Sequence, residues 1–246
     1  MVPKRLALYP YAEDPLAMFG VVCGMVFPVL MFPAAILFGL AELLIPELAR
    51  CAAAGSQTRI RYLVKRSLRV AMLYGCFFCG LMHLLANELC IALYKNAQAG
   101  QYLSWFALVG PILYCDAITD AMTKGLGQQK ACVRYNILTS AMDVILLYLL
   151  LPRWGIGGYF FSFLVTHLLN FALSLGRLKR ISGCSIAWNV PILSIAATLA
   201  SIWGASWVTQ PVLKTVAYML LSGSLLVLFR VLKKDDLLWV KGMVRR

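Results

Sequence analysis

The chain has 246 residues, of which 61% are hydrophobic and 13% charged, and its mean hydropathy is +0.79. This composition excludes a soluble globular domain and predicts an all-α, polytopic helical membrane protein. The formal net charge of +13 would suit a nucleic-acid-binding protein, but not at this hydropathy. We therefore expect no nucleic-acid partner and interpret the basic excess as a signal of membrane topology.

The first predicted element is a polar segment, residues 1–17, which suits a loop or an interfacial helix and lacks the layout of a signal peptide. An apolar stretch at residues 18–47 then predicts the first membrane span. Pro28, Pro33 and Pro46 interrupt it, so we expect kinks or breaks whose freed carbonyls are satisfied by neighbouring helices or a water-lined cavity. Such a span suits a moving transporter or a kinked structural helix, and the sequence leaves both open.

Six further apolar stretches complete the prediction of about seven transmembrane helices. About 20 apolar residues, each rising 1.5 Å, cross a hydrocarbon core of about 30 Å. The predicted spans lie near residues 68–86, 101–122, 132–151, 156–176, 188–208 and 212–230. The tail that follows is polar, basic and faintly amphipathic.

Basic residues are distributed unevenly between the two predicted sides of the membrane. One side holds 18 of the 23 Lys and Arg residues. The other holds Lys4, Arg5, Lys95, Arg153 and Lys214. Short loops rich in Lys and Arg stay cytoplasmic, so we predict a cytoplasmic C-terminus and, with seven spans, an N-terminus outside. Because residues 1–17 carry no export signal, we expect an odd number of spans upstream and interpret the chain as a fragment.

The cysteines and histidines do not predict a metal or redox site. Cys76 and Cys79 form a C-x-x-C inside an apolar span, with no second pair and no suitably spaced histidine. His83 and His167 are isolated, and we expect both to be hydrogen-bonded packing residues rather than ligands. No metalloprotease, P-loop, dinucleotide-binding or nucleophile-elbow motif is present. We therefore expect no enzyme activity, no catalytic residue, no cofactor and no metal.

Ionisable residues inside apolar spans are costly and often functional, so they are the candidates for a substrate or ion pathway. Asp116, Asp120 and Lys124 lie four residues apart on one face of the third span. Asp120 and Lys124 can form an interfacial ion pair, whereas Asp116 lies deeper. Asp143 lies near the middle of the fourth span without an opposite charge at helical spacing. It must therefore face a cavity, contact a partner helix or be protonated.

Four more residues complete the candidate set. Glu42 is a carboxylate inside the first span. Arg66 and Arg69 enter the second span from the basic side, where they can bind an anionic pyrophosphate group or simply mark the cytoplasmic side. Asn170, with Ser174 one turn later, can face a cavity or link two helices by hydrogen bonds.

A series of short motifs resembles the C-terminal half of SpoVB-type proteins. The motifs are VPKRL, FGVVCGM with prolines after it, LIPELA, GLGQQ, LLPRWGIGGY and N-x3-S-x2-RL, in this order within about residues 2–183. SpoVB-type proteins belong to the polysaccharide-transporter branch of the superfamily that includes MATE exporters and lipid II flippases. The resemblance implies fourteen spans, in two six-helix lobes and two extra helices. Residues 1–183 would then be a partial C-terminal lobe of five spans, and residues 184–246 the two extra helices with a cytoplasmic tail.

The resemblance also implies a function, which is export or flipping of a lipid-linked saccharide by alternating access in the cell membrane. The substrate would be a cell-wall or spore-cortex precursor, and the partners would be the bilayer, this lipid and the missing N-terminal lobe. Two alternatives stay open: a cation-coupled multidrug exporter of the same fold, and a non-transporting scaffold in envelope assembly. Acidic cavity residues favour the exporter and basic ones the flippase, so Asp116 and Asp143 keep the exporter open.

Overall fold

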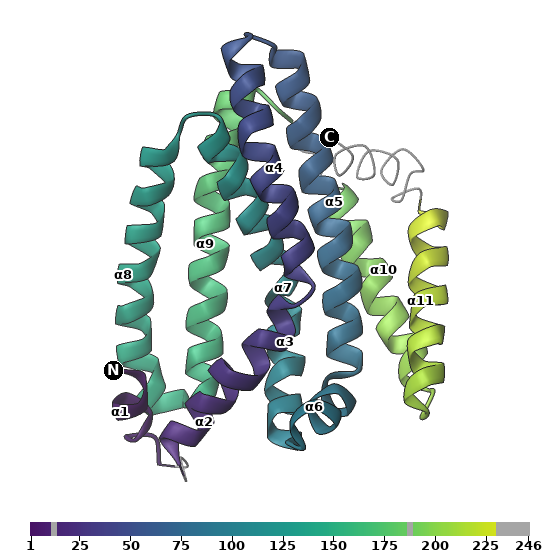
Figure 1. Cartoon of the computed structure of the whole chain (residues 1–246). Coiled ribbons are helices and arrows are strands. Elements are labelled where there is room, and N and C mark those ends of the chain that lie inside the picture. The colour runs from purple at the N-terminus through teal and green to yellow at the C-terminus, as the bar shows by residue number, and fades with distance from the viewer. Residues whose placement is uncertain (11–13, 186–188, 230–246) are drawn as a thin grey trace.

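The computed structural model describes residues 1–10, 14–185 and 189–229, and the regular structure of these residues is entirely helical. The long helices run side by side along one direction (Figure 1). Six of them are long and apolar enough to cross a membrane, and there are seven spans when one bent pair is counted as a single span. The prediction of an all-α polytopic membrane protein with about seven spans is confirmed.

The long helices from α4 onward alternate in direction along the chain (Figure 1). In order they are α1 (Val2–Leu6), α2 (Pro15–Val21), the π-helix η1 (Val22–Val26), α3 (Phe27–Met31), α4 (Ala34–Ala53), α5 (Gln57–Leu84), α6 (Ala86–Tyr94), α7 (Ala97–Gly125), α8 (Gln129–Trp154), α9 (Ile156–Ser182), α10 (Asn189–Ser206) and α11 (Pro211–Leu228). The α4–α5 and α7–α8 turns lie at one end of the molecule, and α1 and α6 lie at the other (Figure 1). We call the end with the α4–α5 turn the basic end, because the predicted basic connections lie there.

Two helices extend well beyond the apolar stretches that predicted them. Helix α5 begins at Gln57, about three turns before the predicted start of its span, because the basic segment that precedes the apolar residues is itself helical. Helix α9 likewise continues through its basic residues to Ser182. Lys and Arg are good helix formers and extend their charged groups toward water, so hydropathy alone misses these turns.

The predicted break in the first span is confirmed next to Pro33. The segments Pro15–Met31 and Ala34–Ala53 meet at an angle of 62°. Neighbouring helices satisfy the carbonyl groups at this break, as lipid cannot. The Tyr114 hydroxyl of α7 donates to the Leu30 carbonyl at 2.6 Å, and the Tyr74 hydroxyl of α5 donates to the Pro33 carbonyl at 2.7 Å.

The other two prolines of the first span have smaller effects. The π-helical turn η1 lies directly before α3, whose second residue is Pro28, and so widens the helix where a backbone donor is missing. Pro46 lies inside α4, which continues to Ala53, so no break occurs there.

Helix α7 is central, because it packs against α4, α5 and α9. Phe27, Phe106 and Phe163 come from α3, α7 and α9 and form a triangle with ring centroids 5.4–5.6 Å apart. Close helix packing depends on small residues, as is usual in membrane bundles. A Cβ atom at Gly75 of α5 would lie 2.9 Å from the Pro111 Cα atom of α7, which is too close for any residue but glycine.

Helices α10 and α11 pack against each other, and α10 also packs against α5. A small cluster of Leu73, Ala197 and Leu226 joins them to the bundle. The Tyr218 hydroxyl of α11 donates to the Phe77 carbonyl of α5 at 2.8 Å. The predicted domain boundary at residue 183 falls between α9 and α10, and this division stays a prediction.

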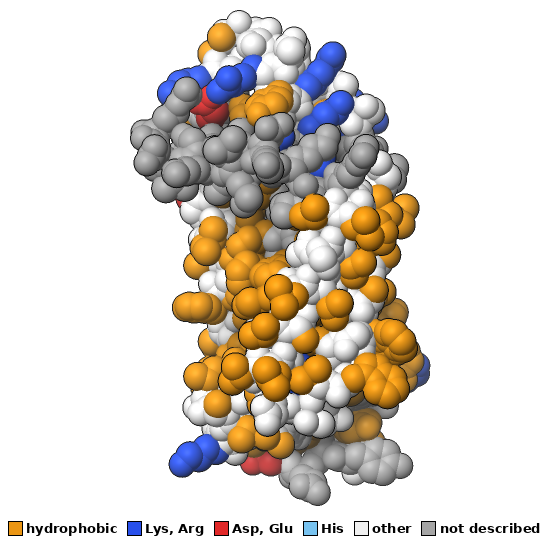
Figure 2. Space-filling model, turned by 90° about the vertical axis from the view of Figure 1, so that its right-hand side faces the viewer, with side chains coloured by type: hydrophobic (Ala, Val, Ile, Leu, Met, Phe, Trp, Pro, Cys, Tyr) orange, Lys and Arg blue, Asp and Glu red, His pale blue; other side chains and the backbone are white. Residues whose placement is uncertain are grey.

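The outer surface matches a bilayer environment. Figure 2 shows apolar side chains over the middle of one face and charged side chains toward its two ends. Trp203 of α10 and Trp207, directly after this helix, are 70% and 76% exposed near the end of the span, where aromatic residues mark membrane interfaces. The identity of the membrane and the cytoplasmic side stay predictions. The tail, with six of the basic residues behind that prediction, lies outside the described residues.

Candidate functional site

A buried polar network joins α7 and α9 inside the membrane-spanning bundle. Asp116 of α7 is only 6% exposed. The Asn170 side-chain amide of α9 donates to both of its carboxylate oxygens, at 2.9 and 3.1 Å, and Nδ1 of His167 lies 3.3 Å from Oδ2. We call Asp116, His167 and Asn170 the Asp116 network. Asp116 lies nine residues before the end of α7, which is about 13 Å from the basic end of that helix.

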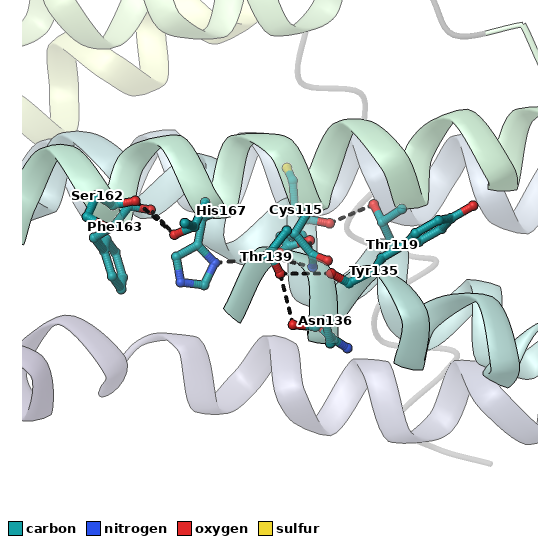
Figure 3. A network of polar contacts seen from close by, with 11 residues as sticks. Cys115, Thr119, Tyr135, Asn136, Thr139, Ser162, Phe163 and His167 are labelled. Carbon is teal, nitrogen blue, oxygen red and sulfur yellow. Dashed lines mark hydrogen bonds and ion pairs between the residues drawn. The ribbon is translucent and has the colours of Figure 1, made fainter. Parts of the chain in front are cut away.

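The sequence of α9 explains why this helix provides the partners. Polar residues recur every four positions and form a buried stripe along α9, namely Ser162, Thr166, Asn170 and Ser174. Figure 3 shows Ser162 of this stripe and the neighbouring His167 of α9, together with labelled residues of α7 and α8. Most hydroxyl groups along these helices donate a hydrogen bond to a backbone carbonyl of their own helix, as Thr119 does to the Cys115 carbonyl at 2.7 Å. Carboxylate and amide groups, by contrast, need partners from another helix.

The Asp116 network retains unused hydrogen-bonding capacity. Among the described residues, Oδ1 of Asn170 and Oγ of Ser174 are buried without a hydrogen-bond partner. A carboxylate only accepts hydrogen bonds, whereas an imidazole can donate or accept, so together they can hold a hydrogen-bonding ligand between the two helices. The arrangement therefore offers oxygen and nitrogen ligands for a polar ligand or a small cation between α7 and α9.

The two other acidic candidates have separate partners. Lys124 lies 2.8 Å from Asp120, which confirms the expected ion pair within α7. Asp143 of α8 accepts a hydrogen bond from the Ser162 hydroxyl of α9 at 2.6 Å. Of the three possibilities that the sequence left open for Asp143, the structure favours contact with a partner helix.

Three further predicted residues can be placed. Glu42 of α4 is exposed, so the described residues do not enclose it. His83 is a hydrogen-bonded packing residue, as predicted, because Nδ1 lies 2.8 Å from the Ser104 carbonyl oxygen. His167 differs from that prediction in having a charged partner, Asp116. The sequence alone did not predict that His167 contacts Asp116, although His167 lies one turn before the candidate residue Asn170.

Arg66 and Arg69 line a pocket of about 380 Å³ between α5 and α10, near the basic end. We call this the basic pocket, and its lining residues are Tyr62, Lys65, Arg66, Leu68, Arg69, Met72, Ser185, Val190 and Pro191. A second pocket of about 110 Å³, the apolar pocket, is lined by Leu68, Met72, Pro111, Ile112, Cys115, Phe171, Leu175 and Pro191. The two arginines thus line a pocket whose lining does not include the residues of the Asp116 network.

The described part of the chain holds no group of three or more His, Cys, Asp or Glu side chains placed to bind a metal ion. Cys76 and Cys79 are buried free thiols within α5. Comparisons with protein-family models, with curated proteins and with solved structures found no match for this chain. The resemblance to the polysaccharide transporters therefore stays a prediction that rests on the motifs named above.

Proposed function

We propose that the chain belongs to a membrane transporter that exports or flips a lipid-linked saccharide across the cell membrane by alternating access. The observation that supports transport is the buried Asp116 network. A charged side chain at the centre of a span costs about 2.5–3.5 kcal/mol on insertion scales, and Asp116 lies five residues from the central residue of α7. Interhelical hydrogen bonds in membranes return only about 0.6 kcal/mol each on average. The two hydrogen bonds from Asn170 do not offset that cost, which favours a functional reason for the carboxylate.

The same helix connects this network to the bend in the first span. Two residues before Asp116 on α7, Tyr114 donates to the Leu30 carbonyl at the 62° bend. Binding at the Asp116 network that shifts α7 against α9 would therefore reach the break next to Pro33. In secondary transporters, discontinuous helices of this kind form the substrate and ion sites near the membrane midplane.

The substrate class of the proposal comes from the motif resemblance and from the basic end of the molecule, which suits a phosphate-bearing lipid. A cation-coupled multidrug exporter is the second candidate. One observation favours it: the unpartnered oxygens of Asn170 and Ser174 lie one turn apart on α9, on the polar stripe that meets the Asp116 carboxylate. Oxygen atoms of this kind are the ligands that small hard cations take.

An Asp116→Asn variant at the chromosomal locus tests the proposal in the organism that carries the gene. The measured quantity is the fraction of lipid-linked saccharide that an impermeant reagent reaches in intact cells. We expect Asp116→Asn to lower this fraction at unchanged protein level. The matched control is Glu47→Gln, which alters only surface ion pairs with Arg50 and Arg59 and should leave the fraction unchanged.

The other functions give different results in the same strains. A multidrug exporter would lose drug efflux in Asp116→Asn while the lipid fraction stays normal. A scaffold would leave both quantities normal, in this variant and in a gene deletion, and would change only envelope assembly. Either result would contradict the proposal.

A further inference from the structure

We infer that the basic pocket and the apolar pocket together bind one membrane lipid with an anionic, phosphate-bearing headgroup. Three cations, Lys65, Arg66 and Arg69, line the basic pocket from little more than one turn of α5. Guanidinium groups bind phosphate oxygens bidentately, and an ammonium group adds a compact positive charge. None of the described residues that line this pocket is acidic.

The two pockets adjoin and differ in chemistry. They share the lining residues Leu68, Met72 and Pro191. The apolar pocket extends from this shared wall between α5, α7, α9 and α10, and its lining residues are all hydrophobic. A charged chamber that leads into an apolar one fits an amphiphile, with the phosphate among the cations and part of one acyl chain beside Phe171.

The surroundings favour a lipid over a soluble phosphate compound. Ile192 and Ile195 lie next to the pocket residue Pro191 on α10 and are 63% and 45% exposed. Apolar side chains exposed beside a pocket face hydrocarbon when the helix spans a bilayer. Arg66 and Arg69 also have other contacts, so a bound phosphate is expected to share these guanidinium groups. The inference concerns binding by this chain alone and does not depend on the transport proposed above.

Lipid binding to the purified chain in zwitterionic detergent, followed by native mass spectrometry, tests the inference. The probes are phosphatidic acid and phosphatidylcholine with the same acyl chains. We expect the chain to bind phosphatidic acid at least about tenfold more tightly, the ratio that corresponds to one charge-assisted contact. Equal binding of the two lipids would overturn the inference.

Two double variants separate a specific site from general attraction. Arg66→Gln with Arg69→Gln should weaken binding of phosphatidic acid by about tenfold or more. The matched control is Arg134→Gln with Arg180→Gln, because both residues are exposed near the same end and the loss of charge is equal. Similar losses in both double variants would contradict a specific site. If the glutamine pair does not fold, Arg66→Lys with Arg69→Lys keeps the charge, and unchanged binding there would contradict bidentate recognition.

The apolar pocket has its own test. Ile112→Trp fills it, so binding should lose its dependence on acyl-chain length while the preference for phosphatidic acid persists. In the unmodified chain, binding should strengthen as the acyl chain lengthens until the apolar pocket is filled. If binding to Ile112→Trp still depends on acyl-chain length as in the unmodified protein, the acyl chain lies outside the apolar pocket. Inorganic phosphate should not displace the lipid, and full displacement would identify a site for free phosphate instead.

Discussion

Replacing Asn170 with leucine removes both hydrogen bonds that its amide donates to Asp116, with little change in side-chain volume. A buried group that loses its partner costs about 1–3 kcal/mol. Interhelical hydrogen bonds in membranes reach at most about 1.7 kcal/mol, and His167 stays 3.3 Å from the carboxylate. We therefore expect Asn170→Leu to lower the free energy of unfolding by about 1–2 kcal/mol.

The double-mutant cycle with Asp116→Leu makes this prediction specific. When both partners become apolar, no buried carboxylate is left, so the double variant should be only slightly less stable than either single variant. The assay is reversible unfolding of the purified chain in mixed micelles with increasing dodecyl sulfate. We expect a coupling energy of about 1 kcal/mol, within the range for residues in contact. The control pairs Asp116→Leu with Asn136→Leu, an exposed residue of α8, and should be additive. A coupling below about 0.3 kcal/mol for Asp116 and Asn170 would refute the reasoning.

Three further predictions concern other parts of the chain. Asp143→Asn should keep the hydrogen bond from Ser162, and its transport rate should be nearly normal. Asp143→Leu, by contrast, should reduce the yield of folded protein. A strongly reduced transport rate in Asp143→Asn would instead place this residue on the transport pathway. Burial alone would raise the pKa of Glu88, but the hydrogen bond and charge of Lys214, 2.6 Å away, outweigh it and lower that pKa below its usual value. The stabilisation from this contact between α6 and α11 is therefore fully present above the unfolded pKa of about 4.3, and it is lost as the pH falls through the lowered folded-state pKa. Acid should therefore lower the unfolding midpoint of the wild type more than that of Glu88→Gln. Equal acid sensitivity of the two proteins would contradict this prediction. A cysteine at Gln57, in a chain without its native cysteines, should escape an impermeant thiol reagent in intact cells, and strong labelling would reverse the predicted orientation.

The spans could be predicted because hydropathy and length are properties of a single segment. The break at Pro33 could be predicted for the same reason, since a proline removes its own donor whatever surrounds it. Sequence alone did not identify the partners at that break. Tyr74 and Tyr114 lie 41 and 84 residues from the carbonyls that they satisfy, and only the packing of α5 and α7 brings them there.

The candidate site shows the same limit. Asp116 and Asn170 were each singled out because polar groups are costly in a span, yet their pairing depends on how α7 and α9 rotate against each other. His167 was assigned to packing because a single histidine has no partner within its own span. The polar stripe on α9 was a usable signal, because Ser162 and Asn170 belong to one four-residue repeat. Reading that repeat would have identified the face of α9 that meets α7 and α8.

Flipping by inverted membrane vesicles tests the central claim most directly. Vesicles prepared from wild-type, Asp116→Asn, Glu47→Gln and gene-deletion cells are supplied with the lipid-linked saccharide, and the initial rate at which it becomes protected inside them is measured. The proposed function predicts similar rates in wild-type and Glu47→Gln vesicles and a rate near that of the deletion in Asp116→Asn vesicles with equal protein content. A wild-type rate in the Asp116→Asn vesicles would contradict a transport role for the Asp116 network, and equal rates in wild-type and deletion vesicles would contradict transport of this lipid altogether.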